Sequence, residues 1–415
     1  MNSHLEKAIA AEIAYTKQQF DEQQQRSPQE LRKEGLVLFP LQFAHFIENN
    51  QATVLQFTCS FVINDTYFKR GSLVKLKAGS SFYNCRILDL EAQTITISSD
   101  SEIEENLQEV ELQLQHIPDD RTLKCMTLGL KLSQTIPQLL TFEADFKQEK
   151  ESHTFENDAL NPSQQQAVGS ILADQPTVII QGPPGTGKTH TLSIAIAELV
   201  KSGKRVIISA PSNTAVDQLA RKVIAQGCQL IRLGNDEKIS ADLQDYTIDG
   251  YLEKGGSSKS IQQLKKQLQQ AENIANRHIR NFTKEAAEER RNARKEAREI
   301  KQLMRKIAKD AVTTLIESSQ VIASTPVGLF NHLSKDFTAD VVFLDEAGQA
   351  LEPLAWLVAS FGKRLVLCGD PQQLPPTVLS PEAVKLGLNI SLLERVAQLQ
   401  TPILCFYKQL THHHK

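Results

Sequence analysis

Apolar side chains recur at a helical spacing over the first 26 residues. Leu5, Ile9, Ile13 and Phe20 fall near one face of a helix, and the pattern breaks at the sequence SPQ. We therefore predict an amphipathic helix here, which forms a helical stalk segment over residues 1–35.

A strand-like pattern follows between about residues 36 and 130. The runs SLVKLKAG, FYNCRILDL and QTITIS alternate or are rich in β-branched and aromatic residues, and Gly, Ser and Asp separate them. Such strands predict a small antiparallel β-barrel, which we place at residues 36–135, with a stalk or linker at 136–159. The acidic stretch SDSEIEENLQEVELQ is typical of a solvated loop.

The pattern changes again at about residue 160. The short apolar runs TVIIQG, RVIISA, QVIAST, VVFLDE and RLVLCGD alternate with helical segments. Continuous apolar strands separated by helices indicate an α/β domain whose parallel sheet is covered on both faces. We place this domain at residues 160–400.

A helical insertion interrupts that domain at residues 240–312. Between Lys259 and Asp310 it has fifteen Lys and Arg residues against seven Asp and Glu. One interpretation is a solvated pair of antiparallel helices held by ion pairs along each helix. The other is that the basic helices also contact phosphates.

Composition narrows the class of protein. The chain has 415 residues, of which 40% are hydrophobic and 23% charged, and this is typical of a soluble protein with two or three domains. Its net charge of −3 does not decide for or against binding to nucleic acid. The cysteines lack any C-x-x-C pair, which is typical of reduced thiols. No apolar run approaches the ~18 residues of a membrane span, and the N-terminus lacks a signal-peptide core, so we expect a cytoplasmic protein with no membrane partner.

The segment GPPGTGKT, at residues 182–189, carries the clearest chemistry. It fits the pattern G-x-x-x-x-G-K-[ST] and stands between an apolar strand and a helix. Its glycines allow backbone N–H groups to converge on phosphate oxygens, Lys188 can reach the β- and γ-phosphates, and the Thr189 hydroxyl can bind Mg²⁺. The predicted nucleotide-binding residues of this segment are Gly182, Pro183, Pro184, Gly185, Thr186, Gly187, Lys188, Thr189 and His190.

Two later strand ends complete the predicted site. The strand VVFLDE delivers Asp345, which can hold the metal, and Glu346, which can orient or deprotonate the attacking water. The segment GDPQQLPPT follows another apolar strand, so it lies at the same carboxyl edge, where Gln373 can sense the γ-phosphate.

The motifs LNPSQQQAV, GPPGTGKTHT, APSNTAVDQL, IRLG, IASTP, DEAGQALEP and GDPQQLPPT resemble, in order and spacing, the first half of superfamily-one helicases. The closest branch is that of the nonsense-mediated-decay and immunoglobulin-mu-binding-type helicases, which move 5′ to 3′. The resemblance implies a RecA-like P-loop NTPase domain with a helical insertion, preceded by a β-barrel on a helical stalk.

The resemblance also implies roles for individual residues. Gln164 would read adenine, so the nucleotide would be ATP with Mg²⁺. Single-stranded DNA or RNA would contact the loop Pro211, Ser212, Asn213 and Thr214, and also Thr325. Read without the family, these last residues are ordinary caps after strands. We expect an aromatic platform on such a track, but the sequence does not place one.

The family carries a second motor domain that supplies arginines to the γ-phosphate. The stretch SLLERVAQLQTPIL keeps to the family pattern, and then the chain reads CFYKQLTHHHK. We therefore expect residues 401–415 to be a truncated or frame-shifted tail, with a deliberate fragment or a natural one-domain protein as rivals. The expected consequence is nucleotide binding with slow hydrolysis and no unwinding, unless a separate chain supplies the second domain.

Three readings of function follow. The first is an ATP-hydrolysing DNA or RNA helicase represented by its N-terminal half. The second is a nucleic-acid-binding module that nucleotide switches without translocation. The third, an unrelated P-loop ATPase such as a transporter subunit, predicts an LSGGQ-like signature that the sequence lacks.

Overall fold

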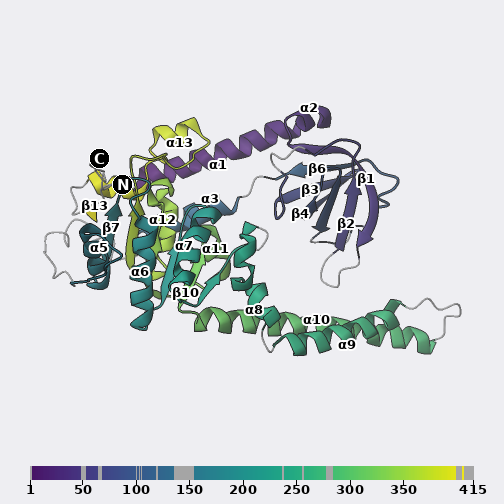
Figure 1. The fold of residues 1–415 in the computed structure, drawn as a ribbon. Coiled ribbons are helices and arrows are strands. Elements are labelled where there is room, and N and C mark those ends of the chain that lie inside the picture. Colours follow the sequence, from purple (N-terminus) through teal and green to yellow (C-terminus); the bar gives the residue numbers. More distant parts are fainter. Residues whose placement is uncertain are drawn as a thin grey trace, which may run out of the picture.

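A computed structural model shows a sheet domain, a β-barrel held away from it by a long helix, and a projecting pair of helices (Figure 1). The described residues are 2–47, 53–63, 68–99, 101, 103, 105–117, 120–134, 154–235, 238–254, 257–276, 284–398 and 404–405. Most of the predicted linker and of the predicted tail lies outside these ranges.

The sheet domain is built on seven parallel strands in the order β13-β7-β12-β11-β8-β10-β9. The strands are β7 (Thr177–Gln181), β8 (Val206–Ser209), β9 (Leu230–Arg232), β10 (Val321–Ser324), β11 (Ala339–Leu344), β12 (Gly362–Gly369) and β13 (Leu404–Cys405). The central strands are buried along nearly their whole length, as the continuous apolar runs predict for a sheet covered on both faces. The predicted parallel sheet is confirmed.

Helices cover both faces of this sheet. One face packs against α5 (Pro162–Leu172), α6 (Lys188–Lys201) and α7 (Asn213–Ala225). The other packs against α1 (Asn2–Gln24), α3 (Arg121–Leu132), α11 (Pro326–His332) and α12 (Glu352–Ala359). The strands contribute alternate residues to the two cores, with Ile207 on one side and Ile208 on the other.

The predicted antiparallel barrel is present and closed, with strand order β1-β2-β5-β4-β3-β6. Its strands are β1 (Val37–Ile47), β2 (Thr53–Thr58), β3 (Leu73–Ala78), β4 (Ser81–Leu90), β5 (Thr94–Ser99) and β6 (Leu112–His116). The barrel ends at His116, so the last part of the predicted barrel segment is instead α3, on the sheet domain. Cys125, Met126 and Leu130 are the buried face of α3, at a helical and not a strand spacing.

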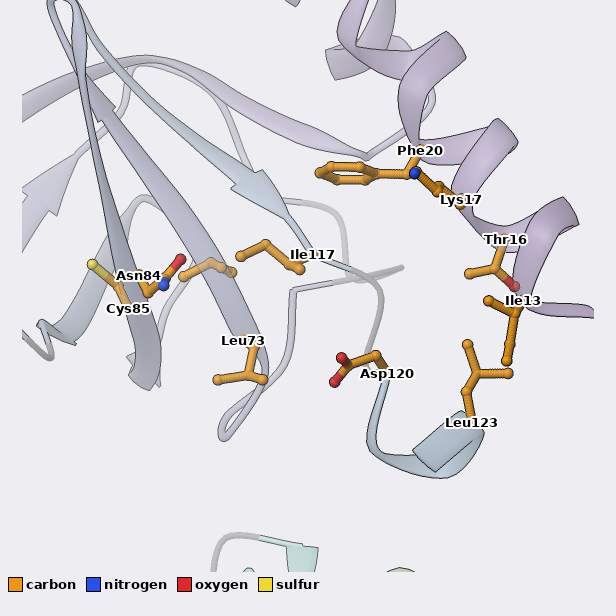
Figure 2. Close-up of a pocket in the computed structure, with 11 residues that line it drawn as sticks. Ile13, Thr16, Lys17, Phe20, Leu73, Asn84, Cys85, Ile117, Asp120 and Leu123 are labelled. Atoms are coloured by element: carbon orange, nitrogen blue, oxygen red, sulfur yellow. The ribbon is translucent and has the colours of Figure 1, made fainter. Parts of the chain in front are cut away.

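Helix α1 runs from the sheet domain toward the barrel, and α2 (Pro28–Lys33) precedes β1 (Figure 1). Leu5 and Ile9 are buried in the sheet-domain core, as the helical spacing predicts. Ile13 is 39% exposed, and together with Phe20 it lines a pocket between α1 and the barrel, with Ile13 beside Leu123 of α3 (Figure 2). Glu12 is buried, and its carboxylate accepts hydrogen bonds from the backbone N–H groups of Leu379 and Ser380, at 2.9 and 2.8 Å. This contact ties the helix to the segment before α13 (Pro381–Lys385).

The insertion leaves the sheet domain after β9. It contains η3 (Ala241–Tyr246), α8 (Ile248–Lys254), α9 (Ser257–Asn276) and α10 (Lys284–Ser318), and the last two pack along each other. Leu268, Ala271, Ala297 and Ile300 form their small shared core. The chain returns to the sheet at β10 (Figure 1).

Three short elements complete the described chain: η4 (Ala347–Gln349), α13 and α14 (Leu392–Gln398). Among the helices of the described ranges, none combines the length and the apolar character that a membrane span requires. Of the predicted tail, Leu404 and Cys405 are described, and they pair in parallel with Ile180 and Gln181 at the end of β7. The three histidines near the C-terminus lie outside the described residues.

Candidate nucleotide-binding site

The segment from Gly182 to Thr189 forms a loop between β7 and the first turn of α6. Gly185 and Gly187 have φ angles of +80° and +84°, which favour glycine because other residues meet a clash of their Cβ atom there. A Cβ atom on Gly187 would also lie 2.6 Å from Nε2 of Gln164. The loop therefore takes its curved shape from residues that its sequence pattern requires.

Lys188 lies inside this curve and is buried. Its ammonium donates hydrogen bonds to the carbonyl oxygens of Gly182, at 2.7 Å, and of Pro183, at 3.2 Å. These carbonyl acceptors hold the ammonium at the centre of the loop, and its charge also acts on the buried Asp345 carboxylate, whose pKa it lowers. An anionic phosphate in the loop would be a stronger acceptor than either carbonyl.

Gln164 supports the loop from outside. Its Oε1 accepts from the backbone N–H of Asn161 at 3.0 Å, which completes a capping box at the start of α5. Its Nε2 donates to the carbonyl of Thr186, also at 3.0 Å. The structure therefore shows Gln164 as a brace between α5 and the loop; its adenine contact stays a prediction and would use the second N–H of the amide.

Asp345 stands at the end of β11, opposite the start of α6. Its Oδ1 accepts from the backbone N–H of Glu346 at 2.9 Å, and the Thr189 hydroxyl lies 3.4 Å from its Oδ2. The side chain is fully buried, and that burial, followed by the nearby charge of Glu346, raises its pKa from 3.8 to about 6. A cation at this point would reverse the effect, because it stabilises the carboxylate.

The donor set at this point suits magnesium. A threonine hydroxyl and one carboxylate meet at the end of the loop, and Mg²⁺ binds through few protein oxygens while keeping several waters. Within the described ranges, no cluster of three or more His, Cys, Asp and Glu side chains is placed to coordinate a metal ion.

Glu346 follows directly and has a φ angle of +52°, in the left-handed region that non-glycine residues rarely adopt. Strain of this kind costs about 1–2 kcal/mol, and surrounding contacts must hold it in place. The turn directs the chain into η4, so that the two adjacent carboxylates take different positions: Asp345 is buried and Glu346 is half-buried.

The loop after β12 meets both preceding loops. The N–H of Gly182 donates to the carbonyl of Gly369 at 3.1 Å, and a Cβ atom on Gly348 would lie 2.5 Å from the carbonyl oxygen of Asp370. Gln373 lies in this loop, with its Nε2 3.4 Å from Oδ2 of Asp370. The structure thus brings the ends of β7, β11 and β12 together at one edge, as the motif positions predict.

His190 follows Thr189 in the first turn of α6 and is half-buried, while Pro183 and Pro184 are exposed on the outer side of the loop. The buried thiol of Cys368, which our sequence reasoning missed, forms a hydrogen bond with Asp345. Burial and the charge of Asp345 raise the pKa of Cys368 well above its ordinary value, so the thiol stays protonated and acts as a donor. An uncharged side chain one residue before GDPQQ carries no sequence signal of this contact.

The predicted nucleic-acid residues lie further along the same edge, after the neighbouring strands β8 and β10. Ser212 caps α7 by accepting from the N–H of Ala215 at 3.2 Å, and Thr325 caps α11 in the same way through Gly328. The two cap hydroxyls therefore have a structural role, as the reading without the family predicts. Pro211 and Asn213 are half-buried, and Thr214 is exposed at the start of α7.

A buried ion pair, which our sequence reasoning also missed, organises this loop. Arg232 is fully buried, and its Nε donates to Oδ1 of Asp217 at 2.8 Å. Its Nη2 donates to Oδ1 of Asn213 at 2.9 Å, so the amide of Asn213 is held by a charged donor. The arginine inside the apolar run of β9 is the signal that could have revealed the pair, since a buried charge needs a partner.

Comparison with known proteins agrees with this geometry. A family model described as "AAA domain" matches residues 159–381. The chain is 32% identical over 254 residues to "DNA-binding protein SMUBP-2" of Rattus norvegicus, which covers 59% of this chain and 25% of the relative. It is 32% identical over 252 residues to "DNA polymerase alpha-associated DNA helicase A" of Schizosaccharomyces pombe, with 60% and 36% covered. A third relative, "Regulator of nonsense transcripts 1 homolog" of Neurospora crassa, is 33% identical over 249 residues, with 59% and 21% covered.

The matched regions span about a fifth to a third of the length of these relatives. The family model covers more than half of the chain and includes the loop around Lys188, Asp345 and Gln373. The predicted resemblance is confirmed: the chain belongs to the AAA domain family, and its relatives include a DNA-binding protein, a regulator of nonsense transcripts and a protein named as a DNA helicase.

Proposed function

We propose that this chain is the nucleotide-binding part of an ATP-dependent nucleic-acid helicase. The observation that carries the proposal is the convergence of three loops, after β7, β11 and β12, on one edge of the sheet. Ligands bind outside the carboxyl ends of strands in open α/β sheets, so the positions of Lys188, Asp345 and Gln373 suit a bound triphosphate.

The residues of this edge divide the work of hydrolysis. The N–H groups of the curved loop and the Lys188 ammonium would hold the β- and γ-phosphates, and Thr189 with Asp345 would hold Mg²⁺. When bound, the ion screens the phosphate charge. Glu346 would orient and deprotonate the attacking water, and Gln373 would contact the γ-phosphate.

We propose that Pro211–Thr214 and Thr325 contact the backbone of single-stranded DNA or RNA. Support comes from the adjacent positions of β8 and β10, which place both loops on one edge, and from the types of side chain, which suit phosphate and sugar contacts. The ion pair of Arg232 with Asp217 fixes Asn213 for such a contact.

Lys188 is the one Lys or Arg among the residues that this proposal assigns to the phosphates, the magnesium ion and the attacking water. Phosphoryl transfer commonly uses an arginine as well, worth about 10³–10⁵ in rate. We propose that a second motor domain supplies it, in the same protein or as a separate chain, and that hydrolysis without that domain is slow. Vigorous hydrolysis stimulated by nucleic acid, from the purified 415-residue chain alone, would contradict this part of the proposal.

The proposal is tested by steady-state ATP hydrolysis with and without single-stranded DNA or RNA, in the wild type and in Lys188→Ala and Glu346→Gln. Lys201→Ala, at the exposed far end of the same helix, is the matched control. We expect a slow activity that nucleic acid increases, that both site variants lose and that the control retains. An activity that survives in Glu346→Gln would remove Glu346 from catalysis.

A nucleic-acid-binding module switched by nucleotide is the second candidate. It is favoured by the contact of Glu12 with the backbone at Leu379 and Ser380, which joins the loop bearing Gln373 to the helix leading to the barrel. ATP-dependent changes in nucleic-acid affinity with no movement along the strand, even when a second motor domain is present, would favour this candidate over the helicase.

A further inference from the structure

Helix α7 begins at the loop that we assign to nucleic acid and also carries side chains that hold the helical insertion. Asn213 opens the helix, and the buried Asp217 lies one turn further along it. After another turn, Arg221 forms an exposed ion pair with Asp242 of η3, in the insertion. The same helix therefore contacts the nucleic-acid loop at its start and the root of the insertion along its side.

The carboxylate of Asp217 divides its two oxygens between different parts of the chain. Its Oδ1 accepts from Nε of Arg232, in β9, at 2.8 Å. Its Oδ2 accepts from the backbone N–H of Ser240 at 3.0 Å and from the Ser240 hydroxyl at 2.8 Å. Because Asp217 and Arg232 are both buried, little water competes for these hydrogen bonds. The carboxylate thus joins β9 to the segment where the insertion begins.

Arg232 connects this arrangement to the loop after β8. Its Nη2 donates to Oδ1 of Asn213 at 2.9 Å, and its Nη1 donates to the carbonyl of Leu233. The guanidinium is a planar fork, so its bonds to Asp217 and to Leu233 fix the direction in which Nη2 points. A Cβ atom on Gly234 would lie 3.3 Å from Nη1, so the next turn also confines the group.

The bond to Arg232 decides which end of the Asn213 amide is left for a ligand. A guanidinium has donors and no acceptor, so the amide oxygen must face it. The NH₂ group at the other end of the amide forms no hydrogen bond with another described residue, and Asn213 is half-buried. The side chain therefore offers N–H donors, which match the acceptor oxygens of phosphate and sugar.

We propose that Ser240, Asp217 and Arg232 are positioning residues for nucleic-acid binding: they hold Asn213 so that its NH₂ group donates to the sugar–phosphate backbone. The inference rests on the proposed contact of the loop Pro211–Thr214 with nucleic acid. It deepens that contact, because it assigns the support of the loop to the root of the insertion. Asp217 and Arg232 are buried, so they act on the nucleic acid through Asn213.

The chemistry of each bond sets the expected losses of affinity. A hydrogen bond to a charged phosphate is worth about 10- to 150-fold, so Asn213→Ala should weaken binding by a factor in that range. Arg232→Lys keeps a cation beside Asp217 but replaces the fork by a single ammonium, so it should weaken binding about as much. Ser240→Ala removes one of two donors to Oδ2 of Asp217 and should weaken binding by about 2- to 10-fold.

The test measures fluorescence anisotropy of labelled oligothymidylate and oligouridylate with the whole 415-residue chain. Arg221→Lys is the matched control, because it makes the same substitution in the same helix, in the exposed pair with Asp242. We expect the affinity of this control to equal that of the wild type. Thermal unfolding and titration with a fluorescent ADP show whether the sheet domain of each variant is folded.

The double variant Asn213→Ala/Arg232→Lys distinguishes positioning from a general loss of structure. If Arg232 acts through Asn213, the double variant binds no more weakly than Asn213→Ala alone. Losses that multiply would show that Arg232 affects binding by another route and would overturn the proposal. The same cycle with Ser240→Ala, a milder change at a half-buried residue, provides a second variant.

The substitution Asn213→Asp tests which end of the amide is used. A carboxylate still accepts from Arg232 but has no donor to give, so binding should fall at least as far as in Asn213→Ala. Binding equal to that of the wild type would overturn the assignment of the NH₂ group.

The outcomes separate the failure of this inference from the failure of the proposed function. If Asn213→Ala weakens binding while Arg232→Lys and Ser240→Ala do not, the positioning role is wrong and the loop contact stands. If Asn213→Ala binds as well as the wild type, the contact proposed for Asn213 is wrong, and the positioning role falls with it. If the wild type binds neither oligonucleotide, the proposed nucleic-acid function is wrong as well.

Discussion

Replacement of Asp345 by asparagine should make the nucleotide-free protein more stable while weakening the proposed magnesium site. Asp345 is fully buried, and its pKa rises from 3.8 to about 6, first because of burial and then because of Glu346. A raised pKa means that the folded state holds the proton more tightly than the unfolded state does. The contribution of this group to stability is therefore complete below about pH 4 and is lost as the pH rises through about 6.

The magnitude follows from the two pKa values. At pH 8 the folded protein has lost the whole contribution of Asp345 to the free energy of unfolding, about 3 kcal/mol. At pH 5 it has lost roughly half of that contribution. Asparagine keeps an acceptor for the N–H of Glu346 but weakens the hydrogen bonds that the carboxylate receives, a cost of about 1 kcal/mol. A net gain of about 2 kcal/mol at pH 8 corresponds to a rise of about 4–8 °C in the melting temperature of a domain of this size.

The assay is thermal unfolding of the wild type and Asp345→Asn at pH 5 and pH 8, without nucleotide or metal. Asp340→Asn is a control of opposite sign, because the backbone N–H of Arg205 and the Lys363 ammonium lower the pKa of Asp340. That variant should be less stable than the wild type at pH 8. If Asp345→Asn is destabilised at pH 8, or if its gain is the same at both pH values, the reasoning about the buried carboxylate is wrong.

Three further substitutions test single contacts. Gly187→Ala should lose nucleotide affinity and about 1–2 kcal/mol of stability, because a Cβ atom is strained at a φ of +84° and would lie close to the side chain of Gln164. Titration with a fluorescent ADP measures the affinity, and thermal unfolding measures the stability. Arg232→Met should cost about 3–5 kcal/mol in chemical denaturation because the buried Asp217 carboxylate loses its charge partner and keeps only its hydrogen bonds from Ser240. The double variant with Asp217→Leu should recover part of that loss; a double variant no more stable than Arg232→Met would show that the unpaired carboxylate is not the source of the cost. Glu12→Ala should cost about 1–3 kcal/mol by leaving the N–H groups of Leu379 and of the buried Ser380 without an acceptor, and an unchanged denaturation midpoint would show that the contact is dispensable.

The sequence predicted the parts of the molecule that local pattern determines. The apolar runs of β7, β8, β10, β11 and β12 identify buried parallel strands, and the glycine pattern of the loop before α6 predicts its shape. Both signals come from residues close together in the chain, where periodicity and backbone freedom decide the structure. The same is true of the alternating strands of the barrel.

Contacts between distant segments were beyond sequence reasoning. Glu12 meets Leu379 and Ser380 across more than 360 residues, and no local pattern marks a helix carboxylate as the cap of a remote turn. Amphipathic spacing predicts one apolar face for Leu5, Ile9, Ile13 and Phe20, yet Ile13 and Phe20 line a pocket between α1 and the barrel, whereas Leu5 and Ile9 are buried in the sheet-domain core. The periodicity of apolar residues shows which side of a helix is apolar, but it does not show which part of the protein that side packs against.

Side-chain roles show the same limit. The resemblance implies that Gln164 reads adenine, which stays a prediction, while the structure adds that both ends of its amide hold Asn161 and Thr186 in place. Cys368 carries no motif, because its importance arises from the position of Asp345 on the next strand. Chemistry that depends on which strands are neighbours becomes visible only when the sheet order is known.

The most direct test of the account is equilibrium binding of a fluorescent ADP, with and without Mg²⁺, to the wild type and to Lys188→Ala. The loops after β7, β11 and β12 form a magnesium–nucleotide site in this account, so the wild type should bind, Mg²⁺ should strengthen the binding, and Lys188→Ala should lose it. Equal binding by the wild type and Lys188→Ala, with no effect of Mg²⁺ on either, would contradict the account.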